Sequence, residues 1–459
     1  MIMFKKVLVA NRGEIAVQII RNLRELGLRS VAVYSTADRD AYFTQIADEA
    51  VCIGGPLPAD SYLNMKEIIS TACLTGSDAI HPGYGFLSEN AQFAQMCAEC
   101  DLTFIGPASN VIEQMGDKAS ARAVMKAAGV PVIPGSSAVL SDAESAVAVA
   151  TDLGYPVMLK ATAGGGGKGM RVVANDDELR KCFDDVQREA NLSFGADSVY
   201  MEKVITNAKH IEMQVMADSF GHVVYFPERD CSLQRHHQKL IEESPSSMVT
   251  AEEREQLGDL VIKACHAIDY RNTGTFEFLM DRDHHFYFME MNTRLQVEHT
   301  VTEEVTGVNL IAAQILVAAG KPLPWTQDDI TIRQYALECR INAENPRAGF
   351  LPSAGKITAL VLPTGTLGVR IDTSLVGPAT IAPYYDSMIS KVIVSAMDRH
   401  RALRRMDRVL GELRVDGVAT NQEFLGDLVH APAFVNDDST IDYVETDFLP
   451  RWLKEHEQI

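Results

Sequence analysis

The chain has 459 residues, a formal net charge of −20 and an apolar fraction of 46%. Such a length predicts two to three lobes rather than one core, and the acidic balance argues against a nucleic-acid surface, which needs a basic stripe. The short apolar run before Asn11 is not a signal peptide and no run approaches the ~18 apolar residues of a membrane span, so a cytoplasmic protein is expected.

The N-terminal segment predicts an α/β lobe. Apolar runs over residues 6–10 and 31–34 indicate strands, and residues 15–26 between them indicate a helix that Gly27 ends. The first turn holds a single Gly13 instead of GxGxxG, which favours a lobe without a dinucleotide. This lobe should close near residues 106–107.

The segment HPGYGFLSEN, residues 81–90, is rich in turn-forming residues and carries His81, Tyr84 and Glu89. It is compatible with a rigid loop and with part of a binding site. The spacing of Cys97 and Cys100, in a helical pattern further along, favours packed thiols over a redox or zinc site.

A glycine-rich segment lies between two predicted strands. The first strand, residues 155–160, leads into TAGGGGKG. Consecutive glycines let backbone N–H groups approach phosphate oxygens closely, and a strand on each side favours a mobile lid over a nucleotide, with a flexible linker as the alternative. The loop is not of the Walker A type, because Gly169 follows Lys168.

The region after this loop is rich in hydrogen-bonding side chains. Period-two alternation places His210, Glu212 and Gln214 on one face of a predicted hairpin. Adjacent His236 and His237 would point opposite ways on an extended chain, so an anion or nucleotide pocket is favoured there over a zinc ion held by both.

Residues 275–299 form the central pattern of the chain. Glu277 alternates with buried phenylalanines on one predicted strand, while Glu290, Asn292 and Arg294 share one face of the next. Phe286 and Phe288 have the same parity as these polar residues, so burial should change side along the second strand. Carboxylate and amide oxygens suit Mg²⁺, whereas an ordinary charged hairpin is the alternative reading.

Beyond residues 321–324, which mark a boundary, a small α+β domain is expected. Residues 335–346 predict a strand that carries Arg340, and short strands continue to residue 377. Residues 383–394 predict a further strand, and residues 399–413 a helix.

Taken together, these motifs resemble the biotin carboxylases of the ATP-grasp superfamily. The resemblance covers essentially the whole chain and rests, in chain order, on ANRGEIA, HPGYGFLSEN, MGDK, GGGGKGMR, ERDCSLQR, HQK, GTFEF, EMNTRLQVEH, ECRINAE and PYYDSM. It implies an N-terminal Rossmann-like α/β domain (1–118), an ATP-grasp domain (119–322) with a mobile glycine-rich lid (132–206), and a C-terminal α+β domain (323–459).

The resemblance also implies an activity: ATP, bicarbonate and biotin would give ADP, phosphate and carboxybiotin. Its implied ATP contacts are Lys118, Lys160, Gly166, Gly167, Glu202, Lys203, Val204, Ile205, His210 and His237. The implied Mg²⁺ or Mn²⁺ ligands, for two ions, are Glu277, Glu290 and Asn292. The implied bicarbonate contacts are Lys239, Arg294, Gln296 and Val297, with Glu298 as base, Arg340 stabilising the biotin oxyanion and Tyr84 beside biotin.

Some positions depart from the family pattern without removing a chemical group. Thr300 replaces a proline, His236 an arginine, and Thr162-Ala163 the commoner Ser-Gly. Gln18 and Leu367 stand where dimerising members have arginine and phenylalanine, which leaves a homodimer open.

The chain lacks the carrier signature, a lysine between two methionines. Biotin is therefore expected on a separate carrier protein, with a separate carboxyltransferase. The expected role is the first half-reaction of an acyl-CoA carboxylase, such as the acetyl-CoA carboxylase of fatty acid biosynthesis; pyruvate and other acyl-CoA carboxylases remain alternatives. A carboxylate–amine ligase with the same fold is a second hypothesis, and a regulatory nucleotide-binding protein without turnover is a third.

Overall fold

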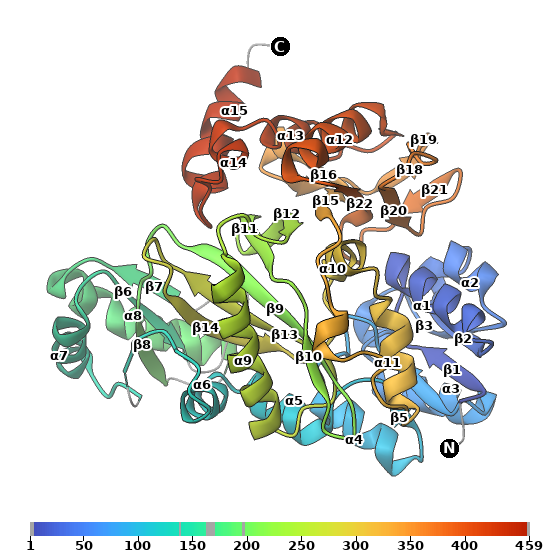
Figure 1. The fold of residues 1–459 in the computed structure, drawn as a ribbon, viewed down its shortest axis with the longest axis horizontal. Helices are drawn as coiled ribbons and strands as arrows, with labels where there is room; N and C mark the ends of the chain where they lie inside the picture. The colour runs from blue at the N-terminus through green and yellow to red at the C-terminus, as the bar shows by residue number, and fades with distance from the viewer. Residues whose placement is uncertain (1–3, 137–138, 162–169, 195–197, 457–459) are drawn as a thin grey trace.

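The computed structural model describes residues 4–136, 139–161, 170–194 and 198–456. It contains an N-terminal α/β lobe, a small lid, a large central sheet and a set of C-terminal helices, which follow one another in colour from blue to red in Figure 1. This arrangement confirms the predicted mixed α/β and α+β fold class.

The N-terminal lobe is a parallel sheet covered by helices on both faces. Its strands run in the order β3-β2-β1-β4-β5. Leu8 packs into one core, whereas Val7 and Val9 pack into the core on the other face, as the period-two rule requires. The elements are β1 (Lys6–Val9), α1 (Gly13–Glu25), β2 (Arg29–Ser35), α2 (Tyr42–Ile46), β3 (Glu49–Gly54), α3 (Met65–Thr75), β4 (Ala79–His81), α4 (Ala91–Glu99) and β5 (Thr103–Phe104).

Two short helices join this lobe to the lid. The run MGDKASARAVMKAAG predicts one amphipathic helix that Gly129 ends. This prediction is wrong, because α5 (Ser109–Gly116) ends before Asp117 and α6 (Lys118–Ala127) begins after it. The Asp117 side chain accepts a hydrogen bond from the Ser120 N–H at 2.7 Å and so caps α6. Lys118 is therefore the first residue of a helix rather than a mid-helix residue.

The lid packs two helices on a small antiparallel sheet. Its elements are α7 (Ala143–Leu153), β6 (Val157–Ala161), β7 (Met170–Val173), α8 (Asp176–Phe194) and β8 (Val199–Lys203), with strand order β7-β6-β8. The predicted strands on both sides of the glycine-rich loop are confirmed. The loop itself, with Gly166 and Gly167, lies outside the described residues.

The central sheet has nine strands in the described part of the chain. Their order is β14-β13-β9-β11-β12-β15-β22-β20, and β10 pairs with β9. The strands and helices of the first part are β9 (Lys209–Ala217), β10 (Val223–Tyr225), β11 (Arg229–Arg235), β12 (Gln238–Ser244), α9 (Ala251–Ala267), β13 (Asn272–Met280), β14 (Phe286–Asn292), α10 (His299–Thr306) and α11 (Leu310–Ala318). Within the described ranges no single helix is long and apolar enough to span a membrane, and α10 and α11 meet that test only together, across a 99° bend.

The C-terminal region continues the same sheet and covers it with helices. Antiparallel pairing of β12 with β15 carries the sheet across residues 322–323, where a domain boundary is predicted. The elements are β15 (Tyr335–Asn342), β16 (Glu344–Asn345), β17 (Leu351–Pro352), β18 (Gly355–Ile357), β19 (Ala359–Val361), β20 (Val369–Thr373), β21 (Ala379–Ile381), β22 (Met388–Ala396), α12 (Arg399–Glu412), β23 (Arg414–Asp416), α13 (Gln422–Leu428), α14 (Pro432–Val435) and α15 (Leu449–His456). The predicted strand from residue 383 begins only at Met388.

Two irregularities in strand pairing position the polar face of this sheet. In the β13/β14 pair, Glu277 faces Glu290 but Phe278 faces Phe288, so Met289 is an extra residue on β14. In the β11/β12 pair, Gln234 faces Lys239 but Leu233 faces Ile241, so Leu240 is extra on β12. An extra residue reverses the parity of everything after it. The bulge on β14 confirms and explains the predicted change of side between Phe288 and Glu290.

Candidate active site

A cavity of about 490 Å³ lies where the central sheet meets the lid and the C-terminal region. That volume is within the usual range for a site that holds a small-molecule ligand. The sequence-predicted residues that line it are Lys118, Lys160, Glu202, His210, His237, Lys239, Glu277, Glu290, Asn292, Arg294, Gln296, Val297, Glu298 and Arg340. The predicted site residues thus come from at least six separate elements and share one cavity.

A row of carboxylates crosses three neighbouring strands on the cavity side. Glu212 on β9 pairs in register with Glu277 on β13, which in turn pairs with Glu290 on β14. Arg229 on β11 faces Glu212 from the other side, with Nε 2.5 Å from Glu212 Oε1. Facing residues on adjacent strands lie within contact of one another. Cations must offset the repulsion between the like charges of this row. Arg229 does so only at the Glu212 end.

Lys239 neutralises most of this row. Its Nζ lies 2.6 Å from Glu212 Oε2, 3.0 Å from Glu277 Oε1 and 2.5 Å from Glu298 Oε1. Burial alone would lower the pKa of Lys239, but these three carboxylates raise it well above its usual value. The ammonium group is therefore permanently charged and joins the row to Glu298.

Glu298 lies between two cations at the start of α10. Besides Lys239, Arg340 contacts it, with Nη2 2.9 Å from Glu298 Oε2. Burial would raise the pKa of Glu298, but Lys239 and Arg340 lower it well below its usual value. The carboxylate is ionised at neutral pH and can accept a proton. The Arg340 guanidinium also donates from Nε to Glu242 Oε1 at 2.5 Å, and its Nη2 contacts the same oxygen.

The three predicted metal ligands come together at the other end of the row. Asn292 Nδ2 donates to Glu277 Oε1 at 2.9 Å, and Glu290 is opposite Glu277. Among the described residues the carboxylate of Glu290 has one partner, Lys118 Nζ, 4.0 Å away. Burial and then Glu277 raise the pKa of Glu290. A poorly neutralised carboxylate beside a second carboxylate and an amide oxygen suits a divalent cation such as Mg²⁺.

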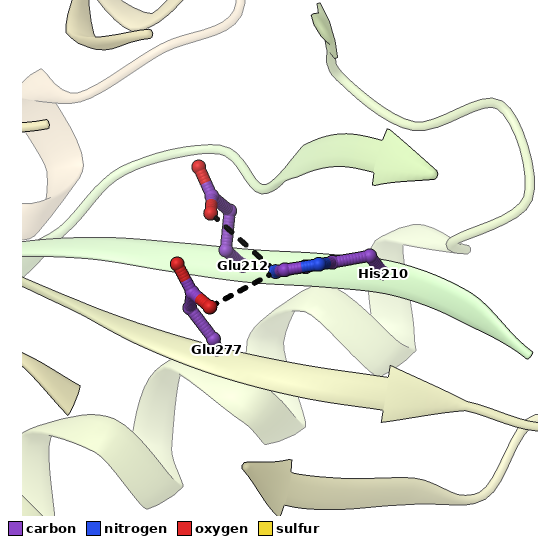
Figure 2. A group of neighbouring side chains, drawn as sticks. All are labelled: His210, Glu212 and Glu277. Carbon is purple, nitrogen blue, oxygen red and sulfur yellow. Dashed lines mark ion pairs between the residues drawn. The ribbon is translucent and has the colours of Figure 1, made fainter. Parts of the chain in front are cut away.

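His210 approaches the same row from β9. Figure 2 shows its ring between two carboxylates, with Nε2 3.2 Å from Glu277 and 3.8 Å from Glu212. These three side chains are also close enough to hold a metal ion. Both glutamates already contact Lys239, however, so ion pairing accounts for the geometry. Of the three predicted metal ligands, Glu290 has the least occupied carboxylate, because Lys118 at 4.0 Å is its one partner among the described residues.

Arg294 links the cavity to the N-terminal lobe. Its Nε lies 2.8 Å from Oε2 of Glu89, and its Nη2 donates to Asn292 Oδ1 at 2.9 Å. Glu89 also accepts a hydrogen bond from the Thr293 N–H at 3.1 Å. The segment 81–90 therefore contributes to this site through Glu89, and the guanidinium is fixed beside the metal ligands.

Glu202 lies at the lid side of the cavity. It contacts Arg122 Nη1 at 2.6 Å and also Lys160 Nζ. Arg122 further donates to the Ile133 carbonyl at 2.8 Å, which ties α6 to the lid. Lys160 and Lys118 place two ammonium groups along the cavity, as a polyanionic phosphate chain requires.

Some predicted contacts do not line the cavity. Lys203 Nζ points away and donates to the carbonyls of Gly154 and Tyr155 at 2.6 and 3.0 Å, and Val204 and Ile205 are not part of the cavity lining. Tyr84 is also absent from the lining, and its hydroxyl donates to Glu14. Roles for these residues stay predictions.

His236 and His237 occupy a hairpin turn. The prediction of an extended chain here is wrong, because both residues have positive φ, 48° and 63°, between β11 and β12. Only His237 lines the cavity, and His236 Nδ1 lies 2.7 Å from Glu445 instead.

Several residues of this site escaped sequence reasoning. Arg229 is fully buried and binds Glu212, Gln214, Thr275, Gln296 and Thr302. Arg122 gave no signal, because an arginine in an amphipathic helix usually faces solvent. Glu212 was placed on the correct face but assigned no role. A strongly polar residue inside the run ERDCSLQR was the one available signal for Arg229.

Lys391 on β22 is a fully buried lysine that joins three regions. Its Nζ donates to the Val297 carbonyl at 2.9 Å and lies 3.2 Å from Glu14 of α1. Burial would lower the pKa of Lys391, but Glu14 and nearby carboxylates raise it. The N-terminal lobe, the segment before Glu298 and the C-terminal sheet thus share one ammonium group.

Family models match three successive parts of the chain. Residues 3–112 match "Biotin carboxylase, N-terminal domain", residues 117–326 match "Carbamoyl-phosphate synthase L chain, ATP binding domain", and residues 338–446 match "Biotin carboxylase C-terminal domain". Together these models cover most of the chain.

Individual proteins match over nearly the full length. Biotin carboxylase 1 of Bacillus subtilis is 52% identical over 97% of this chain and 99% of its own. A pyruvate carboxylase subunit of Methanothermobacter thermautotrophicus is 51% identical over 94% of this chain and 88% of its own. The crystal structure of the biotin carboxylase domain dimer of Hydrogenobacter thermophilus 2-oxoglutarate carboxylase, in complex with MgADP, ADP and bicarbonate, superposes with a TM-score of 0.92 at 47% identity and covers 97% of this chain and 98% of its own.

These relatives share both the sequence and the fold over whole domains, at identities far above those at which only the fold is shared. The chain therefore belongs to the biotin carboxylase family, and it is an ATP-grasp enzyme of the ligase class.

Proposed function

We propose that the protein carboxylates biotin, carried on a separate protein, with ATP and bicarbonate through a carboxyphosphate intermediate. One observation carries the proposal: an ionised Glu298 held between Lys239 and Arg340, in the cavity that also contains Arg294 and the carboxylate row. A base surrounded by cations suits an anionic substrate that must lose a proton.

ATP would lie along the cavity from the lid to the carboxylate row. Lys118 and Lys160 are positioned to bind its phosphates, and Glu202, His210 and His237 line the part where the nucleoside would lie. Glu277, Glu290 and Asn292 would hold Mg²⁺ or Mn²⁺, with two ions proposed. When bound, the metal neutralises charge on the transferring phosphoryl group. The Hydrogenobacter domain, whose structure is in complex with MgADP, supports a nucleotide and Mg²⁺ as ligands of this chain.

Bicarbonate would bind between Arg294, Lys239, Gln296 and the Val297 N–H. Glu298 accepts the bicarbonate proton, and the bicarbonate oxygen attacks the γ-phosphorus of ATP with ADP as the leaving group, which gives carboxyphosphate. A general base needs only hydrogen-bond reach to the proton it removes. Lys239 and Arg294 offset the negative charge that the two reacting anions bring together.

The basicity of Glu298 would depend on its two cations. In the resting enzyme Lys239 and Arg340 hold the pKa of Glu298 well below its usual value, although burial opposes them, and so weak a base is a poor proton acceptor. Substrate anions that draw Lys239 and Arg340 toward themselves would raise that pKa. Binding would thus activate the base at the moment it is needed.

Arg340 would act in the second step. Carboxyphosphate breaks down to CO₂ and phosphate, phosphate removes the N1 proton of the biotin ureido group, and N1 attacks CO₂. Negative charge develops on the ureido oxygen, and a guanidinium there acts as an oxyanion stabiliser. Tyr84 is the proposed neighbour of biotin on the N-terminal lobe.

The final carboxyl acceptor lies outside this reaction. Relatives of similar identity are named as subunits or domains of pyruvate and 2-oxoglutarate carboxylases, so an acyl-CoA acceptor such as acetyl-CoA is one of several compatible with this chain. A carrier protein and a carboxyltransferase are the proposed partners. The dimer of the Hydrogenobacter domain supports a homodimer, with Gln18 and Leu367 as the positions that differ from dimerising members.

The test is bicarbonate-dependent ATP hydrolysis with and without free biotin. We expect little turnover without bicarbonate, slow turnover with it, and stimulation by biotin. Turnover that an amine stimulates and biotin does not would replace this proposal with a carboxylate–amine ligase.

A further inference from the structure

Two glutamates face each other beneath the cavity, on neighbouring strands of the central sheet. Glu242 on β12 and Glu338 on β15 are opposite in the antiparallel register, and both are fully buried. Opposite side chains on one face have Cβ atoms roughly 4.5–5.5 Å apart, so the two carboxyl groups lie close enough to repel each other when both are charged. Neither residue belongs to the predicted site, and neither lines the cavity.

Each carboxyl group has one satisfied and one unsatisfied oxygen. Oε1 of Glu242 accepts a hydrogen bond from Arg340, and Oε2 of Glu338 accepts one from the Thr300 hydroxyl. Oε2 of Glu242 and Oε1 of Glu338 are buried and have no partner among the described residues. Two ionised carboxylates would leave both oxygens unsatisfied and place like charges together, which burial makes costly. A single proton between them removes both problems.

The surrounding cations do not remove the need for that proton. Arg340 on β15, Lys391 on β22, Lys239 on β12 and Glu298 at the start of α10 are the charged groups that face the pair. Each cation is shared with other carboxylates: Arg340 with Glu298, Lys239 with the carboxylate row, and Lys391 with Glu14.

The charged residues beyond Arg340, Lys391 and Lys239 largely pair with one another. Arg370 lies 2.7 Å from Glu303 and 2.8 Å from Asp372, and His299 Nε2 lies 3.9 Å from Glu303. Burial raises the pKa of Glu242 to about 8, although Arg340 and Lys239 oppose it. Burial likewise raises the pKa of Glu338 to about 7, although Lys391 and Arg340 oppose it. The raised pKa values and the two unpaired oxygens thus both indicate a proton on this pair of carboxyl groups.

We propose that Glu242 and Glu338 share one proton between these two oxygens and act together as a positioning pair for Arg340. The role assigned to Arg340 rests on the proposed function, whereas the shared proton does not. With the proton in place the pair carries one negative charge and holds Arg340 through Glu242. Loss of the proton adds a second negative charge beneath the guanidinium and holds it back from the substrate.

The proton can be observed without any enzymatic activity. Infrared spectra of the resting enzyme at about pH 7 distinguish a carboxylic acid from a carboxylate. We expect the spectrum of the protein minus that of Glu338→Gln to contain one carboxylic-acid band, the same for Glu242→Gln, and still only one for the double variant. Glu423→Gln, at an exposed ion pair with Arg347, is the control without such a band. No band, or two bands in the double variant, would overturn the sharing.

A second pair of variants keeps both carboxyl groups and guards against misfolding of the glutamine variants. Thr300→Val removes the hydroxyl that stabilises the ionised form of Glu338, and Thr300→Ser restores it. We expect the valine variant to move the infrared titration to higher pH by about one unit, the value of one hydrogen bond, and serine to reverse the shift. An unchanged titration in the valine variant contradicts the arrangement.

The positioning role is tested by the pH dependence of kcat/KM for free biotin. In the wild type it should fall as the infrared band is lost, and in Glu338→Gln, which mimics the protonated state, this alkaline fall should be absent. A fall that persists in Glu338→Gln refutes positioning while the band still reports the proton. Absence of bicarbonate-dependent ATP hydrolysis in the wild type would instead refute the proposed function and leave the infrared result standing.

Discussion

Replacing Arg340 with alanine separates the two halves of the proposed reaction. The guanidinium contacts two carboxylates, Glu242 Oε1 at 2.5 Å and Glu298 Oε2 at 2.9 Å, and its side chain is only 16% exposed. Little solvent screening is available, so removing this partner from buried carboxylates should cost about 3–5 kcal/mol of folding stability. Protonation of Glu242 should bring the loss toward the lower value.

Arg340→Ala should impair the reaction with biotin much more than it impairs nucleotide binding. An oxyanion donor is worth about 10²–10³-fold in rate, so kcat/KM for biotin should fall by that factor in Arg340→Ala. Nucleotide affinity should change by less than about threefold, since none of the contacts of Arg340 involves Lys118 or Lys160. The assays are biotin-stimulated ATP hydrolysis and calorimetric titration with ADP and Mg²⁺.

The matched control is Arg347→Ala in the same region. Its side chain is 48% exposed and pairs with Glu423 at 2.9 Å, so stability and turnover should both stay close to wild type. Equal losses of ADP affinity and biotin turnover in folded Arg340→Ala, as judged by thermal unfolding, would refute the oxyanion role.

Three other outcomes follow from the same geometry. Glu298→Gln should reduce bicarbonate-dependent ATP hydrolysis by about 10²–10⁴-fold with ADP binding retained, and normal turnover would exclude it as the base. Glu290→Gln should raise the Mg²⁺ concentration needed for half-maximal turnover by tenfold or so, because it removes a charged ligand, and an unchanged Mg²⁺ dependence would place the metal elsewhere. Burial, partly offset by Arg399, raises the pKa of Glu243 to about 7, so its contribution to stability is lost as pH rises through that value. Urea unfolding at about pH 5 and about pH 8 should therefore show up to about 3 kcal/mol more pH-dependent loss in wild type than in Glu243→Gln, and equal losses would contradict the assignment.

Much of the local structure could be predicted because hydrophobic periodicity is a local property. The first two strands of the N-terminal lobe and the central hairpin are where the apolar pattern places them, and the side change between Phe288 and Glu290 is visible in the sequence. The bulge at Met289 that causes this change is not, because it depends on pairing with a partner strand. No element is predicted beyond residue 413, where the structure has β23, α13, α14 and α15.

The site was predictable in its residues but not in its arrangement. Glu277 and Glu290 stand out as polar residues in apolar strands, whereas their alignment with Glu212 depends on β9 pairing with β13, some 60 residues later in the chain. The role of Arg229 could not be predicted for the same reason. Its five hydrogen-bonding partners come from other segments of the chain, so the sequence around it does not show that it is buried. His236 and His237 are predicted to lie on an extended chain, but they form a two-residue turn. Their residue types alone do not distinguish the two conformations.

The single ammonium group of Lys391 couples parts of the chain that are far apart in the sequence. Glu14, near the N-terminus, and Val297, next to the base, both contact the same Nζ. A charge-removing change at Glu14 would leave the buried Lys391 ammonium without this carboxylate, so we expect it to reduce turnover as well as the stability of its own lobe. Genetic suppressors of such a change should map to β22 or to the segment before α10, hundreds of residues away.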